Sequence, residues 1–167
     1  RNADGSLGMT CGNGLRLTAR FLVEQGYEKT GSFKIGTRAG IVTAHVDPAD
    51  KNFENIAIQM GTFAPIENRE ITVTTETGSW QASGISSPNP HAVTIVGNIW
   101  DAGSLGDYPS VSPDTTFPEG VNVEFVEPKS PTHIAMRTHE RGVGETLACG
   151  SGSCAAAQVW AGKNELE

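Results

Sequence analysis

Cysteine is scarce in this sequence, and the three residues present are an odd number. A secreted scaffold held together by disulfides needs many paired cysteines, so the composition favours free thiols in a reducing compartment, and the cytoplasm is the expected location. The spacing of Cys11 and Cys149 still allows the fold to bring them together and the two thiols to oxidise to a disulfide.

Positive charge is also in short supply, because 12 Lys and Arg residues stand against 19 Asp and Glu residues, for a formal net charge of −7. No Lys/Arg cluster reverses this balance, which argues against a nucleic-acid-binding protein. No apolar run approaches the roughly 20 residues of a membrane-spanning helix, so no membrane association is expected. The chain begins at Arg1 without an initiator Met and closes at Glu167 just past an expected helix, and we interpret it as truncated at both ends.

Sequence patterns for several metals and cofactors are missing as well. There is no Cys-x-x-Cys and no closely spaced Cys/His pair, so neither a zinc site nor a thioredoxin-like redox site is predicted. Gly142 and Gly144 are not followed by the third glycine of a dinucleotide-binding fingerprint, and no Walker pattern occurs.

Hydrophobic patterning predicts a helix near each end of the chain and strands between them. Leu15, Ala19 and Leu22 form one apolar stripe, which predicts a helix over 13–25, and a second helix is expected after Cys149. β-Branched runs and alternation predict strands at 32–37, 40–46, 55–60, 71–75, 92–96, 121–126 and 133–138, with a loop at 108–120.

The two ends of the chain repeat one motif. Cys11 is followed by Gly-Asn-Gly and an apolar helix, and Cys149 is followed by Gly-Ser-Gly and another. Each cysteine also has a polar residue nine positions upstream, Asn2 in the first copy and Glu140 in the second. Two copies of one unit predict two α+β domains that face each other about a pseudo-two-fold axis. We assign these domains to 1–80 and 81–167.

A cysteine at a helix N-terminus is well placed for acid–base chemistry. Unpaired backbone N–H groups and the helix dipole stabilise an anion there, so the pKa of such a thiol is expected to fall and to supply thiolate at neutral pH. The adjacent glycines leave the same N–H groups open to a substrate carboxylate. If Cys11 and Cys149 flank one carbon, a thiolate can remove a proton from one face while a thiol delivers a proton to the other. Cys154, among the alanines of the second helix, is expected to be a core residue.

The two cysteine segments closely resemble the signature motifs of the diaminopimelate epimerase family. The first reads Asn-Ala-Asp-Gly-Ser…Cys-Gly-Asn-Gly over 2–14, and the second reads Glu-Arg-Gly-Val-Gly-Glu-Thr-Leu-Ala-Cys-Gly-Ser-Gly over 140–152. The resemblance covers nearly the whole chain, and Asn13 stands where the related proline racemases typically carry a His. It implies two pseudo-symmetric domains, each a mostly antiparallel sheet wrapped around a central helix.

That resemblance also implies an activity, the reversible interconversion of LL- and meso-diaminopimelate in lysine and peptidoglycan-precursor synthesis, without pyridoxal phosphate, metal or another cofactor. Cys11 and Cys149 would be the two acid–base residues, and His91 and Glu140 would tune the thiols. The implied substrate-binding residues are Asn2, Gly12, Asn13, Asn89, Asn122, Glu140, Arg141, Gly150 and Ser151. The implied partner is a small-molecule substrate, and a homodimer is compatible with this reading.

Three other hypotheses for the function stay open at this point. An epimerase or racemase of another amino acid, such as proline or hydroxyproline, would use the same pair of thiols. A non-catalytic relative would bind its ligand without exchanging hydrogen. A structural protein would hold a Cys11–Cys149 disulfide. Because the two motifs are so similar, neither shows which cysteine acts on which stereoisomer.

Overall fold

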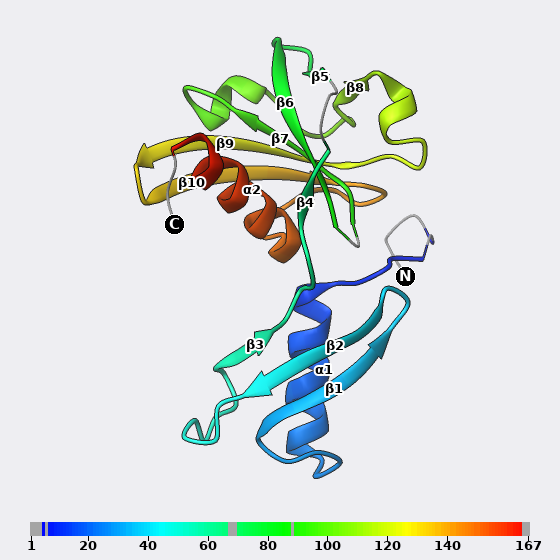
Figure 1. Ribbon diagram of the computed structural model, residues 1–167, viewed down its shortest axis with the longest axis vertical. Coiled ribbons are helices and arrows are strands. Elements are labelled where there is room, and N and C mark those ends of the chain that lie inside the picture. Colours follow the sequence, from blue (N-terminus) through cyan, green and yellow to red (C-terminus); the bar gives the residue numbers. More distant parts are fainter. Residues whose placement is uncertain (1–4, 6, 67–69, 88, 165–167) are drawn as a thin grey trace. The chain divides into compact units, whose positions relative to one another are not determined.

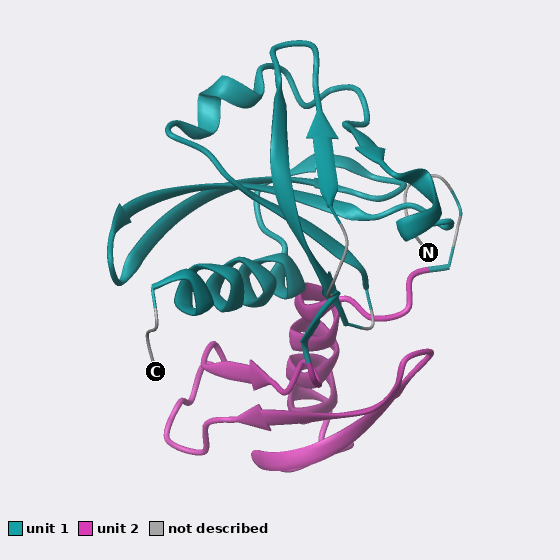
Figure 2. Ribbon diagram, turned by 45° about the horizontal axis from the view of Figure 1, so that its top comes forward, with its two compact units in different colours: residues 1–7, 63–167 teal, residues 8–62 magenta. Residues whose placement is uncertain are grey.

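The computed structural model describes residues 5, 7–66, 70–87 and 89–164, and the chain divides into two compact units (Figure 2). Unit 2 spans Gly8–Thr62, and unit 1 comprises Arg1–Leu7 with Phe63–Glu167. In its described residues each unit combines a sheet with one α-helix (Figure 1), and the predicted α+β class is confirmed. Residues 80 and 81, where the sequence places the domain boundary, lie inside a strand of unit 1 that pairs with neighbours on both sides.

Unit 2 is a helix packed against a three-stranded antiparallel sheet. Its elements are α1 (Gly12–Glu24), β1 (Gly31–Thr37), β2 (Gly40–Val46) and β3 (Ile56–Ile58), in the sheet order β1-β2-β3. The predicted helix and hairpin are confirmed to within one residue. The hairpin closes between Thr37 and Gly40, where a φ of 113° favours glycine. Ala19 of the helix is fully buried against Ala44 and Val46 of the sheet.

Unit 1 is built on an eight-stranded sheet, counted over the residues that the structure describes. Its strands are β4 (Ala64–Pro65), β5 (Ile71–Thr74), β6 (Ser79–Ser86), β7 (His91–Ile95), β8 (Ser110–Ser112), β9 (Asn122–Ser130), β10 (His133–Glu140) and β11 (Gly144–Thr146). The 3-10 helices η1 (Ile99–Ala102) and η2 (Asp114–Thr116) and the helix α2 (Gly150–Lys163) complete the unit. The sheet order is β11-β10-β9-β7-β6-β5-β8, with β4 paired to β6. β7 and β9 are parallel, and the other pairs are antiparallel.

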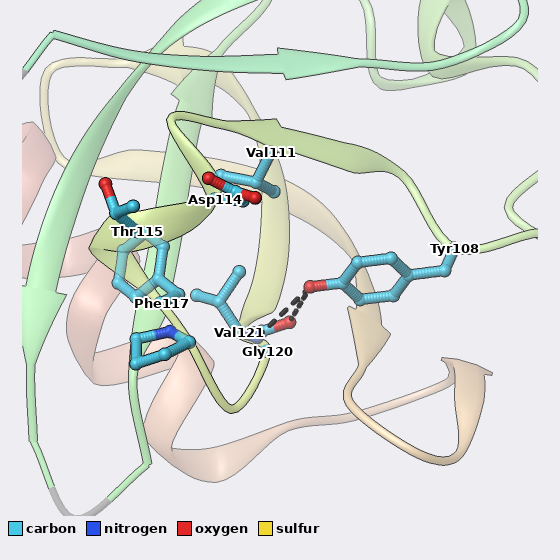
Figure 3. Close-up of a pocket in the computed structure, with 8 residues that line it drawn as sticks. Tyr108, Val111, Asp114, Thr115, Phe117, Gly120 and Val121 are labelled. Carbon is cyan, nitrogen blue, oxygen red and sulfur yellow. Dashed lines mark hydrogen bonds between the residues drawn. The ribbon is translucent and has the colours of Figure 1, made fainter.

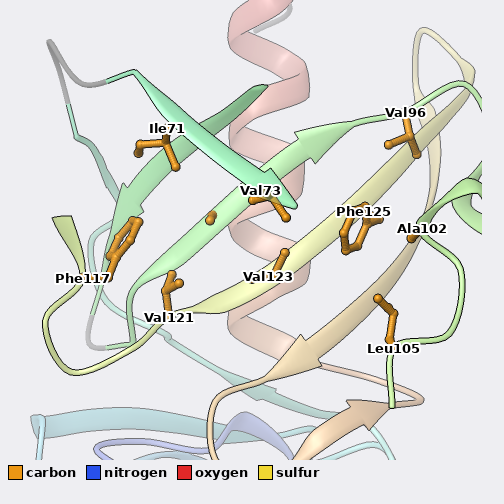
Figure 4. Close-up of a cluster of buried hydrophobic side chains, with 10 residues drawn as sticks. Ile71, Val73, Val96, Ala102, Leu105, Phe117, Val121, Val123 and Phe125 are labelled. Carbon is orange, nitrogen blue, oxygen red and sulfur yellow. The ribbon is translucent and has the colours of Figure 1, made fainter. Parts of the chain in front are cut away.

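The sheet of unit 1 carries a hydrophobic core on each face. Figure 4 shows the first, formed by Ile71, Val73, Ala92, Val96, Ala102, Leu105, Phe117, Val121, Val123 and Phe125. On the other face α2 packs against β7, β9 and β10 through Ala155, Ala156 and Val159. Because these three residues turn one side of α2 to the sheet, Cys154 falls on the opposite side and is exposed. The prediction that Cys154 is a core residue is therefore wrong.

Strand alternation decides which polar side chains lie under α2. Val123 and Phe125 of β9 point into the first core, so Asn122 and Glu124, which alternate with them, point to the face that α2 covers. His91 pairs with Asn122 across the parallel β7–β9 ladder. The register thus places polar residues of neighbouring strands side by side on the α2 face.

Candidate active site

Each motif cysteine is the N-cap residue of an α-helix. Cys11 has an extended backbone, and its Sγ accepts a hydrogen bond from the Gly14 N–H, with an N···S distance of 3.5 Å. Cys149 has the same conformation, and its Sγ accepts from the Gly152 N–H at 3.3 Å. The sulfur takes the place that a Ser or Asp oxygen usually occupies at a helix cap. The predicted placement of both thiols at helix N-termini is confirmed.

The surroundings of the two thiols differ. Cys11 is exposed, whereas only 5% of Cys149 is exposed and the Ser151 Oγ lies 3.7 Å from its Sγ. Burial raises the pKa of the Cys149 thiol from 9.0 to about 11, although the Gly152 N–H acts in the opposite direction; the Glu140 carboxylate adds to the rise. The expectation that the helix end lowers the pKa is wrong for Cys149, because removing the thiolate from water outweighs its cap hydrogen bond.

Predicted site residues of unit 1 come together at the ends of β7, β9 and β10. His91 and Asn122 are register partners, and the Asn122 Oδ1 accepts from the Arg141 backbone N–H at 2.9 Å. The Glu140 Oε1 accepts from the Thr146 Oγ1 at 2.6 Å. Residues that are far apart in the sequence thus form one polar cluster, and the charge of Glu140 acts on the Cys149 thiol.

Backbone contacts fix the position of Arg141. Its Nη1 donates to the carbonyl oxygen of Glu119 at 2.9 Å and to that of Gly120 at 3.5 Å. Upstream of β7, the carbonyl oxygen of Asn89 accepts a hydrogen bond from the Ser87 hydroxyl.

The remaining predicted residues divide between the units. Gly12 and Asn13 open α1 in unit 2, and Gly150 and Ser151 open α2 in unit 1. Asn2 lies outside the described residues. Over the described part of the chain, no three His, Cys, Asp or Glu side chains gather as metal ligands. No helix there is long and apolar enough to cross a membrane.

Glu124 belongs to the cluster, although the motifs did not single it out. Its Oε1 lies 2.8 Å from the His91 Nδ1 and accepts from the Thr138 Oγ1 at 3.4 Å. Glu124 and His91 are both fully buried. Burial raises the pKa of Glu124, and the hydrogen bond with His91 opposes that rise. The available sequence signal was alternation, because Glu124 shares the Asn122 face in the first half of the strand, where the other residues, Val123, Phe125 and Val126, are apolar.

A cavity of about 370 Å³ lies next to the segment that leads into β9 (Figure 3). At one side of it, the Tyr108 hydroxyl donates to the Val121 carbonyl oxygen at 3.0 Å and accepts from the Val121 N–H at 3.1 Å. The lining residues are Tyr108, Val111, Asp114, Thr115, Phe117, Pro118, Gly120 and Val121. None of the predicted site residues lines it, so we do not assign it to the reaction.

The architecture and the sequence point to the same group of proteins. A hydroxyproline epimerase from Agrobacterium vitis shares the fold, with a TM-score of 0.68 and 14% identity over 95% of this chain and 54% of that one. The family model for diaminopimelate epimerase matches residues 84–167. Diaminopimelate epimerases from Streptomyces coelicolor and Acidothermus cellulolyticus are 41% and 40% identical to the chain. The chain belongs to the diaminopimelate epimerase family.

The alignments with the Streptomyces and Acidothermus proteins cover nearly all of this chain but only about half of each relative. They include 100% and 99% of this chain but 56% and 52% of the Streptomyces and Acidothermus proteins. The chain thus spans little more than half the length of these relatives. Family membership therefore describes this part of the protein, and the epimerase activity of the whole protein is taken up under the proposed function.

Gly152 and Gly14 occupy the same position in the two helices and offer a matched test. A Cβ added at Gly152 would lie 2.6 Å from the Glu124 Oε1, so Gly152→Ala is expected to destabilise unit 1 by about 1–3 kcal/mol. A Cβ at Gly14 would meet only the Cβ and Sγ of Cys11, each at 3.6 Å, so Gly14→Ala should be neutral or mildly stabilising. Urea unfolding, followed by tryptophan fluorescence for unit 1 and circular dichroism for unit 2, measures both. Equal effects would contradict the close contact between Glu124 and α2.

The raised pKa of Cys149 predicts a loss of stability in alkali. The folded state holds this proton more tightly than the unfolded state, so the contribution is present below pH 9 and disappears as the pH rises through about 11. Relative to Cys149→Ser, the unfolding free energy should fall by on the order of 2–3 kcal/mol over that window. Urea titrations at several pH values test this, and parallel curves for the two proteins would show that the thiol is not desolvated.

Proposed function

We propose that the protein is a diaminopimelate epimerase, in which Cys11 and Cys149 act on opposite faces of the substrate α-carbon. The observation that carries the proposal is the repeated cap geometry, with each sulfur accepting the N–H of a glycine three residues further on. The choice of diaminopimelate as the substrate rests on membership of the diaminopimelate epimerase family. The proposal includes a cytoplasmic location, a small-molecule partner, and no resident cofactor.

The substrate carboxylate is expected to bind at the helix ends. The first N–H groups of an α-helix have no acceptor within the helix, and the helix dipole adds partial positive charge at the same place. In α2 these groups belong to Gly150 and Ser151, immediately after the Cys149 thiol. They can hold the carboxylate in the ground state and stabilise the charge that develops on it when the α-proton leaves.

Inversion needs a thiolate and a thiol at the same time. The thiolate takes the α-proton, the electrons of the C–H bond stay with the substrate, and the thiol gives its proton to the opposite face. Since burial raises the pKa of Cys149 to about 11, this residue is a thiol at neutral pH, which suits it to donate a proton. The roles of the two cysteines exchange between the forward and reverse reactions.

The polar cluster of unit 1 provides groups for the remainder of the substrate. Diaminopimelate has two carboxylates and two ammonium groups, and a guanidinium such as that of Arg141 pairs with a carboxylate through two hydrogen bonds. Glu140 carries a charge that can attract an ammonium group, and the same charge acts on the Cys149 thiol. His91 is the second group proposed to tune the thiols. The other proposed contacts are Asn2, Gly12, Asn13, Asn89 and Asn122.

Hydrogen exchange tests the proposal. The complete protein encoded by the gene, kept reduced in heavy water, should convert LL- to meso-diaminopimelate and incorporate deuterium at the α-carbon, as read by NMR. Cys11→Ser and Cys149→Ser should each slow inversion by roughly 10²–10⁴-fold, because each removes one acid–base group. Cys154→Ser is the control and should behave as the unmodified protein, since Cys154 is exposed on the outer side of α2.

A substrate panel separates the alternatives. Faster turnover of proline or hydroxyproline than of diaminopimelate would reassign the substrate. Tight binding of diaminopimelate without deuterium incorporation would identify a binding protein that keeps the fold. Unchanged inversion in either cysteine variant would rule out the two-thiol mechanism.

A further inference from the structure

Glu124 is the buried acidic residue that the proposed mechanism leaves without a role. It lies on the α2 face of β9, and neither it nor His91 has any exposed surface. A buried, hydrogen-bonded polar pair of this kind is weak evidence for stability, because apolar residues of similar volume often serve the fold as well. We therefore ask which groups the Glu124–His91 pair holds in position.

The contacts of Glu124 connect three elements of unit 1. Its Oε1 lies 2.8 Å from the His91 Nδ1 on β7 and accepts from the Thr138 hydroxyl on β10. The same oxygen lies 2.6 Å from the place where a Cβ of Gly152 would stand, in the first turn of α2. One carboxylate oxygen thus lies against the imidazole and fills the space beside Gly152, in the helix turn that Cys149 caps.

Two polar atoms of the pair remain unsatisfied. The His91 Nε2 and the Glu124 Oε2 are buried without a hydrogen-bond partner in the part of the chain that the structure describes. Buried polar atoms in native proteins are nearly always paired, so each exception needs a reason. An imidazole whose Nδ1 donates to a carboxylate keeps Nε2 as its acceptor nitrogen, and here that nitrogen is the unpaired one.

We propose that Glu124 is a positioning residue, which accepts the Nδ1–H of His91 and thereby leaves Nε2 as the proton-accepting nitrogen of the ring. The Glu124 carboxylate occupies the space where a Gly152 Cβ would lie, so the group that orients the His91 ring sits beside the helix turn that Cys149 caps. Glu124 itself touches no substrate. The inference rests on the proposed function for its consequence in catalysis, but the choice of tautomer is a property of the resting protein.

Nitrogen-15 NMR of the histidine rings in the complete protein tests the tautomer directly, with His91→Gln used to assign the signals. The unmodified protein should show His91 protonated at Nδ1 and unprotonated at Nε2. In Glu124→Gln the carboxamide can donate to or accept from Nδ1, so the Nε2–H tautomer should appear. A resting protein with His91 protonated at Nε2 would overturn the proposal, whether or not the variant folds.

Kinetics then distinguish positioning from a purely structural role. Glu124→Gln should lower kcat about 10- to 100-fold with little change in KM. Glu127→Gln, on the same strand with its carboxylate bound to Lys129 and the Ile99 N–H, is the control and should leave kcat unchanged. A lower melting temperature with kcat and tautomer intact would make Glu124 merely structural. If the unmodified protein lacks epimerase activity, the proposed function fails, while the NMR result still decides the role of Glu124.

Discussion

The hydrogen bond from a glycine N–H to a cysteine sulfur is the interaction on which the rest of this structure depends. It starts each helix and, by the same contact, fixes the position of a thiol beside the backbone groups that can bind a carboxylate. A Ser or Asp would also cap the helix, but neither offers a thiol, the group that the proposed proton transfer uses. The same contact therefore begins a helix and positions a thiol for the proposed chemistry, and it occurs twice in the chain.

The two copies of this contact have diverged in their surroundings. In unit 1, Cys149 is buried against a sheet face that carries His91 and Glu124, and Gly152 leaves the space that the Glu124 carboxylate fills. In unit 2, Cys11 is exposed, and the equivalent Gly14 has no comparable neighbour. Burial favours the uncharged form of Cys149, which suits this thiol to the role of proton donor in the proposed reaction.

Much of this fold was predictable from the sequence, and the exceptions have physical causes. Strands rich in β-branched residues, such as β5 and β9, were found, whereas β6 was missed because Ser-Trp-Gln-Ala-Ser-Gly-Ile-Ser lacks such a run. Spacing placed both cysteines at helix ends but carried no information on burial, which reversed the expected pKa shift of Cys149 and exposed Cys154. Glu124 acquires its significance from strand register and from the helix above it, which local motifs do not encode.

The central claim is that Cys11 and Cys149 work on one carbon from opposite sides. A crystal structure of the complete protein with diaminopimelate bound tests it most directly. The account predicts that the α-carbon lies between the two sulfur atoms, each at about 3–3.5 Å, with the carboxylate on the N–H groups that open α1 and α2. A complex in which only one sulfur approaches the α-carbon, or both approach the same face, would contradict it.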